Sequence, residues 1–392
     1  MKGSRNFIFQ FTGQGIGKLI TFLFYIFLPS LIGPLEYGKF SFLLALSLII
    51  VQPIVEMGLD ILITKWIVKG KSDVFKKAFF IRMYASLIAF FILFLISFFL
   101  DINRYLLFLI FSYHILGFFQ NIIFSSLRGI EDMRFEGIIF PIQRLLAFLF
   151  LFILFYLGIK DAFLAPFSLL LSLILGLAVL LFLTKDILKD ILNKGEEMGY
   201  NDLIKEGFFL GLITLLWLIY FKIDSIMLGI MKGDFEVGIY NVSYRIMDGI
   251  LFIPGTIMLV FFPKLSKDFK GVFWKLFFVL GGIGLIVSFI LYLFAPILIK
   301  LIYGAKFLPS IPVLQILSLA IFFIFLGHLA TQSLVALDRS NLYLLVAFIG
   351  TALNIFLNFL LIPSLGAIGA AYATVITEGF VMLFCFYFVW KR

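Results

Sequence analysis

The sequence contains few of the residues that build disulfides, metal centres and soluble catalytic sites. Of its 392 residues one is a cysteine, Cys385, so no disulfide can form within the chain. The two histidines, His114 and His328, are too few for a histidine-rich metal site. Charged residues make up 14% of the chain, against roughly 25% in soluble domains. These scarcities exclude a secreted disulfide scaffold and a soluble globular enzyme, and they argue against redox or zinc chemistry.

Apolar residues fill long stretches of the chain instead. Hydrophobic residues account for 63% of the sequence, and 54 residues are phenylalanine. The apolar stretches are long enough to cross a bilayer and are continuous rather than alternating, which favours transmembrane helices over a β-barrel. The net charge of +9 comes from basic residues in short loops, where they set membrane orientation. We therefore predict an all-α polytopic membrane protein in a lipid bilayer, with no nucleic-acid partner.

Twelve apolar segments are predicted to span the membrane. They cover residues 7–29, 39–57, 77–100, 104–127, 137–158, 162–184, 205–231, 237–262, 272–299, 308–336, 341–362 and 367–390. After the second segment, Leu59 to Val68 is predicted to form an amphipathic tail. Of the 31 lysines and arginines, twenty lie in loops on the N-terminal side of the membrane, six on the other side and five within spans. This bias predicts a multi-pass protein of the cell (cytoplasmic) membrane with both termini in the cytoplasm.

A pattern of glycine, glutamate and an aromatic residue occurs twice, at a spacing of 200 residues. Gly33-Pro-Leu-Glu-Tyr-Gly-Lys-Phe40 follows the first span, and Gly233-Asp-Phe-Glu-Val-Gly-Ile-Tyr240 follows the seventh. Six spans separate the copies, so both halves would enter the membrane in the same sense, as in a parallel repeat. The sequence therefore predicts two six-helix bundles, residues 1–195 and 196–392, related by a pseudo-two-fold axis along the membrane normal and enclosing a central cavity. The alternative is that two similar turns arose by chance.

Several charged side chains fall inside predicted spans, where each costs roughly 2.5–3.5 kcal/mol on insertion scales. They are Lys18, Glu56, Arg82, Arg144, Lys222, Asp224, Arg245, Asp248 and Glu378. Such groups should face a watery cavity or a partner. The first half is net positive within its spans and the second is net negative. We therefore expect the first half to attract an anion and the second to host a cation.

Simpler roles stay open for several of these charges. Arg82 and Arg144 could extend their side chains to the membrane surface. A structural ion-pair network between neighbouring spans could be formed by Lys222, Asp224, Arg245 and Asp248. Lys18 has no acidic neighbour on its own span, which favours a place in a cavity.

The first span contains Gly13-Gln-Gly-Ile-Gly17-Lys18, which superficially looks like a phosphate-binding loop. The pattern G-x-x-x-x-G-K-[ST] requires glycine where Thr12 stands and a hydroxyl where Leu19 stands, so the match fails. The glycines predict instead that another helix approaches this face closely.

Five segments of the chain carry the motifs of a known family. They are L-I-G-P-L-E-Y-G at 31–38, E-M-G-L at 56–59, I-D-S-I-M-L-G at 223–229, V-G-I-Y-N-V-S-Y-R at 237–245 with Pro254, and P-S-L-G-A-I-G-A-A-Y at 363–372. In this order the chain resembles the polysaccharide flippases of the multidrug/oligosaccharidyl-lipid/polysaccharide exporter superfamily. The resemblance implies two bundles arranged as a V, alternating access and movement of polyprenyl-linked sugars across the membrane.

The resemblance also implies a substrate-binding set. A sister branch, the lipid-linked peptidoglycan precursor flippases, places basic residues in spans 1, 2 and 8 of its cavity. Lys18 and Arg245 match the first and last of these, and Gln52 stands near the position in span 2. With the intramembrane residues Arg144 and Lys222, these three form the predicted substrate-binding set.

A cation site is implied in the second half. The sister branch binds sodium between spans 7, 11 and 12, and the similar residues here are Asp224, Asn354, Asn358 and Thr374. That branch usually has an acidic residue where Asn358 stands, so the predicted sodium site carries less negative charge. Glu378 completes the predicted cation-coupling group. The alternative is that the two asparagines, which share one helix face, only hydrogen-bond neighbouring helices.

The predicted function is translocation of a polyprenyl-pyrophosphate-linked oligosaccharide in surface polysaccharide biosynthesis, coupled to a cation gradient. We expect no enzymatic activity, no cofactor beyond a sodium ion or proton, and a monomer or weak oligomer. Two alternatives stay open. One is a drug/cation antiporter of the same superfamily, and the other is a membrane glycosyltransferase or ligase, against which the short external connections argue.

Overall fold

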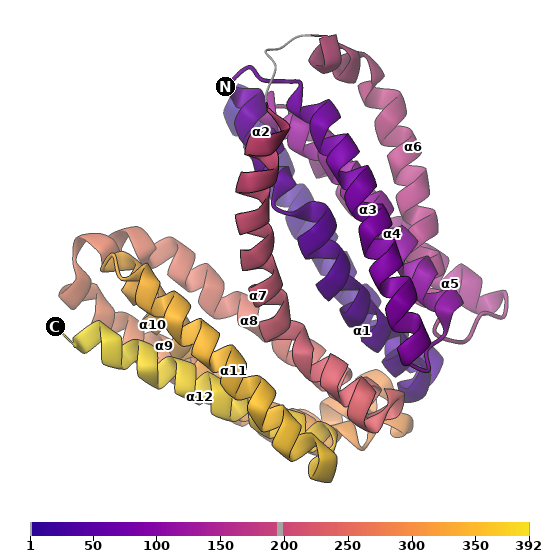
Figure 1. The fold of residues 1–392 in the computed structure, drawn as a ribbon. Coiled ribbons are helices and arrows are strands. Elements are labelled where there is room, and N and C mark those ends of the chain that lie inside the picture. The colour runs from indigo at the N-terminus through magenta and orange to yellow at the C-terminus, as the bar shows by residue number, and fades with distance from the viewer. Residues whose placement is uncertain (1, 194–198, 392) are drawn as a thin grey trace. The chain divides into compact units, whose positions relative to one another are not determined.

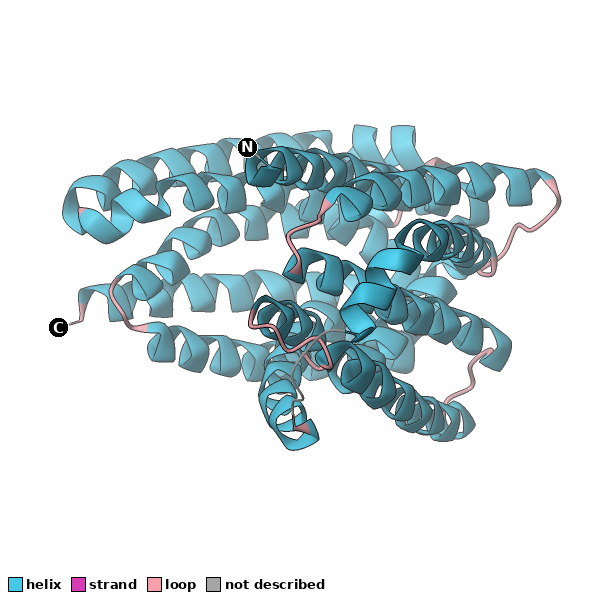
Figure 2. Ribbon diagram, turned by 90° about the horizontal axis from the view of Figure 1, so that it is seen from above, coloured by secondary structure: helices cyan, strands magenta, loops and turns pink. Residues whose placement is uncertain are grey.

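The computed structural model describes residues 2–193 and 199–391, and within these ranges the chain is helical and contains no strand (Figure 2). The helices are α1 (Lys2–Val51), α2 (Leu59–Val68), α3 (Val74–Phe99), α4 (Arg104–Gly129), α5 (Arg134–Tyr156), α6 (Leu164–Asn193), α7 (Tyr200–Lys232), α8 (Asp234–Lys267), α9 (Phe269–Tyr303), α10 (Ser310–Ala336), α11 (Ser340–Leu365) and α12 (Ala367–Trp390). A π-helical turn, Gln52–Glu56, precedes α2, and a 3₁₀ turn, Ala305–Phe307, precedes α10. The predicted all-α class is confirmed, and α2 coincides with the predicted amphipathic tail.

Eleven helical segments of the described chain are long and apolar enough to cross a membrane. The first of them, Phe9–Val68, contains nearly all of the first predicted span and the whole of the second, so the predicted count of twelve is not confirmed. This segment has 60 residues, far more than the roughly 20 that one membrane crossing needs. Within it, α1 consists of two helical segments joined by a kink at Gly33, whose φ of 81° and ψ of 171° are not helical. The two expected spans are therefore continuous in the chain because one glycine bends the helix instead of a loop ending it.

The chain divides into two compact units, each described separately. Unit 1 comprises Met1–Leu31 and Leu43–Ile219. In it α5 packs on α6, and α4 packs on α2, α3 and α6 (Figure 1). The glycines of the first span lie at a helix crossing, because a Cβ on Gly13 would overlap the backbone of Gly137 and one on Gly17 would overlap the ring of Phe140. The predicted close approach of another helix is confirmed, and that helix is α5.

Unit 2 comprises Ile32–Phe42 and Tyr220–Arg392. Its centre is α10, which packs against α8, α9 and α12, while α11 lies along α12 (Figure 1). Unit 2 thus includes a short piece of α1 as well as the last part of α7, which no loop separates from the rest of those helices. The predicted bundles, 1–195 and 196–392, their pseudo-two-fold relation and their V-shaped arrangement stay predictions.

The two copies of the repeated motif pack against each other inside unit 2. Gly33 and Gly233 have nearly the same backbone conformation, with φ of 81° and 87° and ψ of 171° and 178°. A Cβ on Gly38 would overlap the carbonyl of Asp234, and a Cβ on Gly238 would overlap the carbonyl of Pro34. Because Gly38 and Gly238, like Pro34 and Asp234, are separated by 200 residues, this crossing is reciprocal. The motif therefore serves as a helix-crossing element that attaches residues 32–42 to unit 2.

Candidate functional site

A buried carboxylate, Asp224 on α7, lies at the centre of a polar cluster in unit 2. The exposed fraction of Asp224 is 5%. One oxygen, Oδ1, accepts a hydrogen bond from Asn358 Nδ2 of α11 at 2.5 Å. The other, Oδ2, accepts from the Tyr240 hydroxyl of α8 at 2.6 Å and from Thr374 Oγ1 of α12 at 3.1 Å. Four helices therefore meet at one carboxylate.

The two asparagines of α11 extend this cluster. Asn358 Nδ2 also donates to Asn354 Oδ1 at 3.0 Å, as expected for residues four apart on one helix face. The other amide atom, Asn358 Oδ1, is buried and has no hydrogen-bond partner among the described residues. The structure thus brings together in unit 2 all four residues of the predicted sodium site.

The cluster is chemically suited to a small monovalent cation. It supplies oxygen atoms from Asp224, Asn354 and Thr374, which are hard ligands of the kind that alkali and alkaline-earth cations prefer. It contains a single carboxylate, and within the described residues no group of three or more histidine, cysteine, aspartate or glutamate side chains could hold a metal. Rotation of the Asn358 amide by a half-turn would exchange its nitrogen for the unpartnered oxygen beside Asp224. One carboxylate with neutral oxygens balances one positive charge.

A second acid, the half-buried Glu378, lies one helical turn away. Glu378 of α12 accepts a hydrogen bond from the hydroxyl of Tyr220 on α7 at 2.6 Å. Tyr220 precedes Asp224 by four residues and Glu378 follows Thr374 by four, so α7 and α12 face each other with two consecutive polar contacts. Each acid is therefore held by a tyrosine hydroxyl, Tyr220 or Tyr240. Sequence reasoning missed both tyrosines; the only signal was the aromatic position of the repeated motif, which Tyr240 occupies.

Two basic residues of the predicted substrate-binding set, Lys222 and Arg245, belong to unit 2. Arg245 of α8 has its Nη1 atom 3.9 Å from Asp248 Oδ2 on the same helix. Lys222 of α7 is half-buried and interacts electrostatically with Arg245, Asp248 and Asp224. The alternative of a structural ion-pair network among these residues stays open: Asp224 is held by neutral donors, whereas Lys222, Arg245 and Asp248 interact electrostatically with one another.

The remaining members of the predicted substrate set belong to unit 1. Lys18 of α1 is exposed, and Gln52 is half-buried in the π-helical turn. Arg144 of α5 donates from Nη1 to the Tyr113 hydroxyl at 3.2 Å, and its guanidinium lies 4.9 Å from the ring centre of Phe140. The Nε of Arg144 is buried without a partner, and no described carboxylate forms an ion pair with this guanidinium. The set is thus divided between the two units, three residues in one and two in the other.

Two other arginines of unit 1, Arg82 and Arg128, differ from Arg144 because each has a carboxylate partner. Arg82 of α3 is fully buried, pairs through Nη2 with Asp60 Oδ1 at 2.5 Å and donates to the carbonyl of Phe118. The expectation that Arg82 could extend to the membrane surface is therefore wrong, since Asp60 on α2 neutralises it inside the protein. Sequence reasoning treated α2 as a tail and did not consider Asp60 as a partner.

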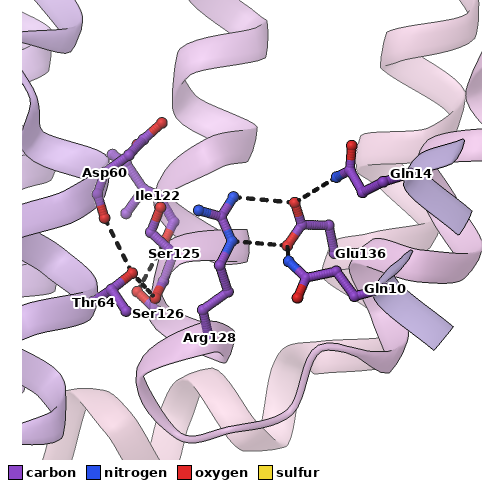
Figure 3. Close-up of polar contacts among 9 residues, drawn as sticks. All are labelled: Gln10, Gln14, Asp60, Thr64, Ile122, Ser125, Ser126, Arg128 and Glu136. Carbon is purple, nitrogen blue, oxygen red and sulfur yellow. Dashed lines mark hydrogen bonds and ion pairs between the residues drawn. The ribbon is translucent and has the colours of Figure 1, made fainter. Parts of the chain in front are cut away.

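Arg128 at the end of α4 forms a two-point contact with Glu136 of α5 (Figure 3). Its Nε and Nη2 atoms lie 2.8 and 3.1 Å from the two carboxylate oxygens. Two glutamines of α1 complete the network, with Gln10 Nε2 donating at 3.3 Å and Gln14 Nε2 at 2.9 Å. The network fastens the first turns of α1 to α4 and α5, next to the crossing of Gly13.

Comparisons with known proteins assign the chain to a family. Residues 4–269 match the family described as "Polysaccharide biosynthesis protein", and the chain belongs to that family. It is 24% identical over 295 residues to the uncharacterized membrane protein MJ1068 of Methanocaldococcus jannaschii, covering 71% of this chain and 57% of that protein. It is 31% identical over 179 residues to the capsular polysaccharide biosynthesis protein CapF of Staphylococcus aureus, covering 43% of this chain and 45% of CapF. The chain thus spans less than two thirds of the length of these two relatives.

Solved structures share the fold. The lipid II flippase MurJ in an inward closed conformation superposes with a TM-score of 0.70 at 17% identity, covering 98% of this chain and 87% of MurJ. An inward-facing multidrug resistance transporter of the MATE family superposes with a TM-score of 0.63 at 13% identity, covering 96% of this chain and 93% of the transporter. The predicted family resemblance is confirmed: this is a multi-pass membrane protein of the polysaccharide biosynthesis family, with a fold shared by flippases and transporters.

Proposed function

We propose that this protein moves a polyprenyl-pyrophosphate-linked oligosaccharide across the cytoplasmic membrane by alternating access. Family membership supports a role in polysaccharide biosynthesis, and the fold supports translocation rather than catalysis. The observation that carries the proposal is Arg144, a guanidinium within a membrane helix that pairs with a phenol hydroxyl instead of a carboxylate. A cation held in this way keeps its charge available for an anion, and a guanidinium binds phosphate oxygens with two parallel hydrogen bonds.

Basic and polar groups would hold the substrate while its lipid tail stays in the bilayer, and we assign this role to Lys18, Gln52, Arg144, Lys222 and Arg245. Arg245 lies close to Asp248, so we expect it to contribute less attraction than Arg144. Both termini would face the cytoplasm, as the distribution of lysine and arginine suggests.

Coupling to a cation gradient would use the cluster around Asp224. A sodium ion among Asp224, Asn354, Asn358 and Thr374, or a proton on the nearby Glu378, would favour the conformation in which these groups are brought together. An ion shifts such an equilibrium only through its different affinities for the two conformations. The meeting of four helices at one carboxylate supplies such a difference, because any separation of the helices would dismantle the site.

Transport in proteoliposomes tests the proposal. A fluorescent polyprenyl-pyrophosphate-linked oligosaccharide is incorporated in both leaflets, and its translocation is followed by quenching from outside, with and without a sodium gradient. We expect Arg144→Gln to slow translocation at least tenfold and Arg134→Gln, an exposed arginine on the same helix, to leave the rate unchanged. Equal rates for wild type and Arg144→Gln, in protein of equal thermal stability, would refute the anion-binding role.

A drug/cation antiporter is the second candidate, favoured by two acids within the helices of unit 2, Asp224 and Glu378, and by the fold shared with the MATE transporter. Loading the same proteoliposomes with a lipophilic cationic dye separates the two functions. Dye efflux that requires Asp224 and Glu378, without translocation of the lipid-linked oligosaccharide, would establish antiport. Oligosaccharide translocation without dye efflux would establish the flippase.

A further inference from the structure

The end of α2 in unit 1 carries a basic cluster built around one indole ring. The Nζ atoms of Lys65, Lys69 and Lys71 lie 4.9, 4.8 and 5.1 Å from the centre of the Trp66 ring. Trp66 is itself held in place, because it packs against the buried core that α2 shares with α3, α4 and the neighbouring ends of α6 and α7. Three ammonium groups therefore converge on a fixed aromatic surface.

The backbone turn after α2 produces this convergence. The Lys71 amide donates to the Trp66 carbonyl at 2.9 Å, and the Gly70 amide donates to the Ile67 carbonyl at 2.9 Å. Gly70 has a φ of 80°. Together these features define a Schellman motif, in which the residue after the left-handed glycine contacts the residue three positions before the helix cap. Lys71 is thereby folded back over Trp66, so the cluster is specified by local geometry.

Charge compensation in the cluster is incomplete. Lys65 pairs with Glu206 at the start of α7, with Nζ and Oε2 2.7 Å apart. Lys69 and Lys71 have no acidic partner among the described residues. Two like charges held near one ring repel each other unless an anion is bound between or above them.

The cluster adjoins exposed apolar side chains of the same helix. On α2, Ile61 is 64% exposed and Val68 is 67% exposed, so apolar side chains of the same helix face outward. Tryptophan is enriched at the level of lipid headgroups, with lysines reaching toward the phosphates. An anion that meets this site from the bilayer is therefore a lipid headgroup.

We propose that Trp66, Lys69 and Lys71 form a binding site for the phosphate of an anionic phospholipid, with Glu206 limiting its affinity by neutralising Lys65. The site lies outside the proposed transport cluster, and its test does not depend on transport. A phosphate would accept hydrogen bonds from the two ammonium groups, and its acyl chains would lie along the exposed apolar face of α2.

Trp66 fluorescence provides the test. In a variant in which the other tryptophans, Trp217, Trp274 and Trp390, are replaced by phenylalanine, Trp66 is quenched only by lipids carrying bromine near it. We expect saturable quenching by acyl-brominated phosphatidylglycerol added to the detergent-solubilised protein, weakened by salt. Brominated phosphatidylcholine should quench much less. Equal quenching by the two lipids would overturn the proposal, because it would show that the headgroup charge is not recognised.

Three variants complete the experiment. Each lysine near a headgroup contributes about fivefold in affinity, so Lys69→Gln with Lys71→Gln should weaken phosphatidylglycerol binding about 25-fold. The control, Lys267→Gln with Lys270→Gln, removes the same charge from exposed positions of unit 2 and should change nothing. Glu206→Gln frees Lys65 and should strengthen binding about fivefold, whereas a merely structural role of the ion pair predicts weaker binding. Unchanged binding in the lysine variant, weaker binding in Glu206→Gln, or displacement of the phospholipid by an equimolar polyprenyl pyrophosphate would each refute the assignment.

Discussion

The arginines of unit 1 differ in their bonding partners, and the partner indicates whether the charge has a structural role. Arg82 and Arg128 each bond a carboxylate, from Asp60 and Glu136, whereas Arg144 bonds the hydroxyl of Tyr113. Breaking a buried ion pair leaves an uncompensated charge, which costs far more than the pair itself contributes. The first two arginines are therefore committed to holding helices together, and the third is the one that we propose binds an anionic substrate.

Asp60→Asn should destabilise the protein strongly. It would leave the fully buried guanidinium of Arg82 without its counter-charge, and we expect a loss of about 3–5 kcal/mol in the free energy of unfolding. Thermal and denaturant unfolding in detergent micelles measures this. Asp132→Asn is the control: Arg134 lowers the pKa of Asp132, but Arg134 is exposed whereas Arg82 is fully buried, so loss of this pair should cost less than about 1 kcal/mol. Similar losses in the two variants would contradict the structural role of Asp60.

Asn358→Asp should make stability depend strongly on sodium. A second carboxylate would lie beside Asp224, where Asn358 Nδ2 now lies 2.5 Å from Oδ1, so repulsion should lower the melting temperature in sodium-free buffer. Sodium bound between the two acids should restore it, since a ligand of the folded state stabilises that state. Melting curves in sodium chloride and choline chloride measure the difference. Asn241→Asp, on α8 of the same unit, should show no sodium-specific gain, and an equal gain there would argue against a site at Asp224.

Among the helices, the paired glycines explain why residues 32–42 group with unit 2. Gly38→Ala and Gly238→Ala would each push a methyl group into backbone of the opposite motif copy, and we expect each to cost about 1–3 kcal/mol. Gly255→Ala is the control on α8, because a Cβ there meets no neighbouring atom and should be neutral or slightly stabilising. Melting temperatures of the three variants and the wild type in detergent measure these changes in stability. Tolerance of alanine at both Gly38 and Gly238 would mean that the crossing is looser than the structure has it.

Helix ends were predicted correctly where a turn ends the helix, as after α2, and incorrectly where the helix continues through a kink, as at Gly33 in α1. The amphipathic segment Leu59–Val68 forms α2 because its buried apolar side chains recur every three or four residues, and the turn at Gly70 ends the helix. The first two spans became one continuous segment, since a bend at Gly33 keeps the surrounding residues helical. Local sequence supports both a bend and a turn at such a glycine, and the packing of Gly38 on Asp234 favours the bend.

For the complete chain, the proposed coupling predicts that a gradient acts through Asp224. In proteoliposomes an imposed sodium gradient should accelerate translocation by wild-type protein and leave Asp224→Asn insensitive, because the neutral amide cannot balance the charge of the ion. Asp248→Asn, near Arg245 on α8, should retain the response. A gradient response that survives in Asp224→Asn but disappears in Asp248→Asn would move the coupling site to α8.

The membrane class, the helical architecture and the family were readable from the sequence because they depend on local chemistry. Long apolar runs must satisfy their backbone hydrogen bonds within each segment, which leaves the helix as the available structure, and motifs keep their order along the chain. The resemblance also grouped Asp224 with Asn354, Asn358 and Thr374, which the fold then placed in contact.

Which side chains pair with one another could be learned only from the folded chain. Tyr220 meets Glu378 across 158 residues, and Tyr240 meets Asp224 across 16 residues and a change of helix. Helical periodicity relates residues three or four apart, so it carries no information about which side chain of a distant helix completes a hydrogen bond. Packing alone made Arg82 a structural cation and left Arg144 without a carboxylate, because each charge is neutralised by whatever the neighbouring helix brings within reach.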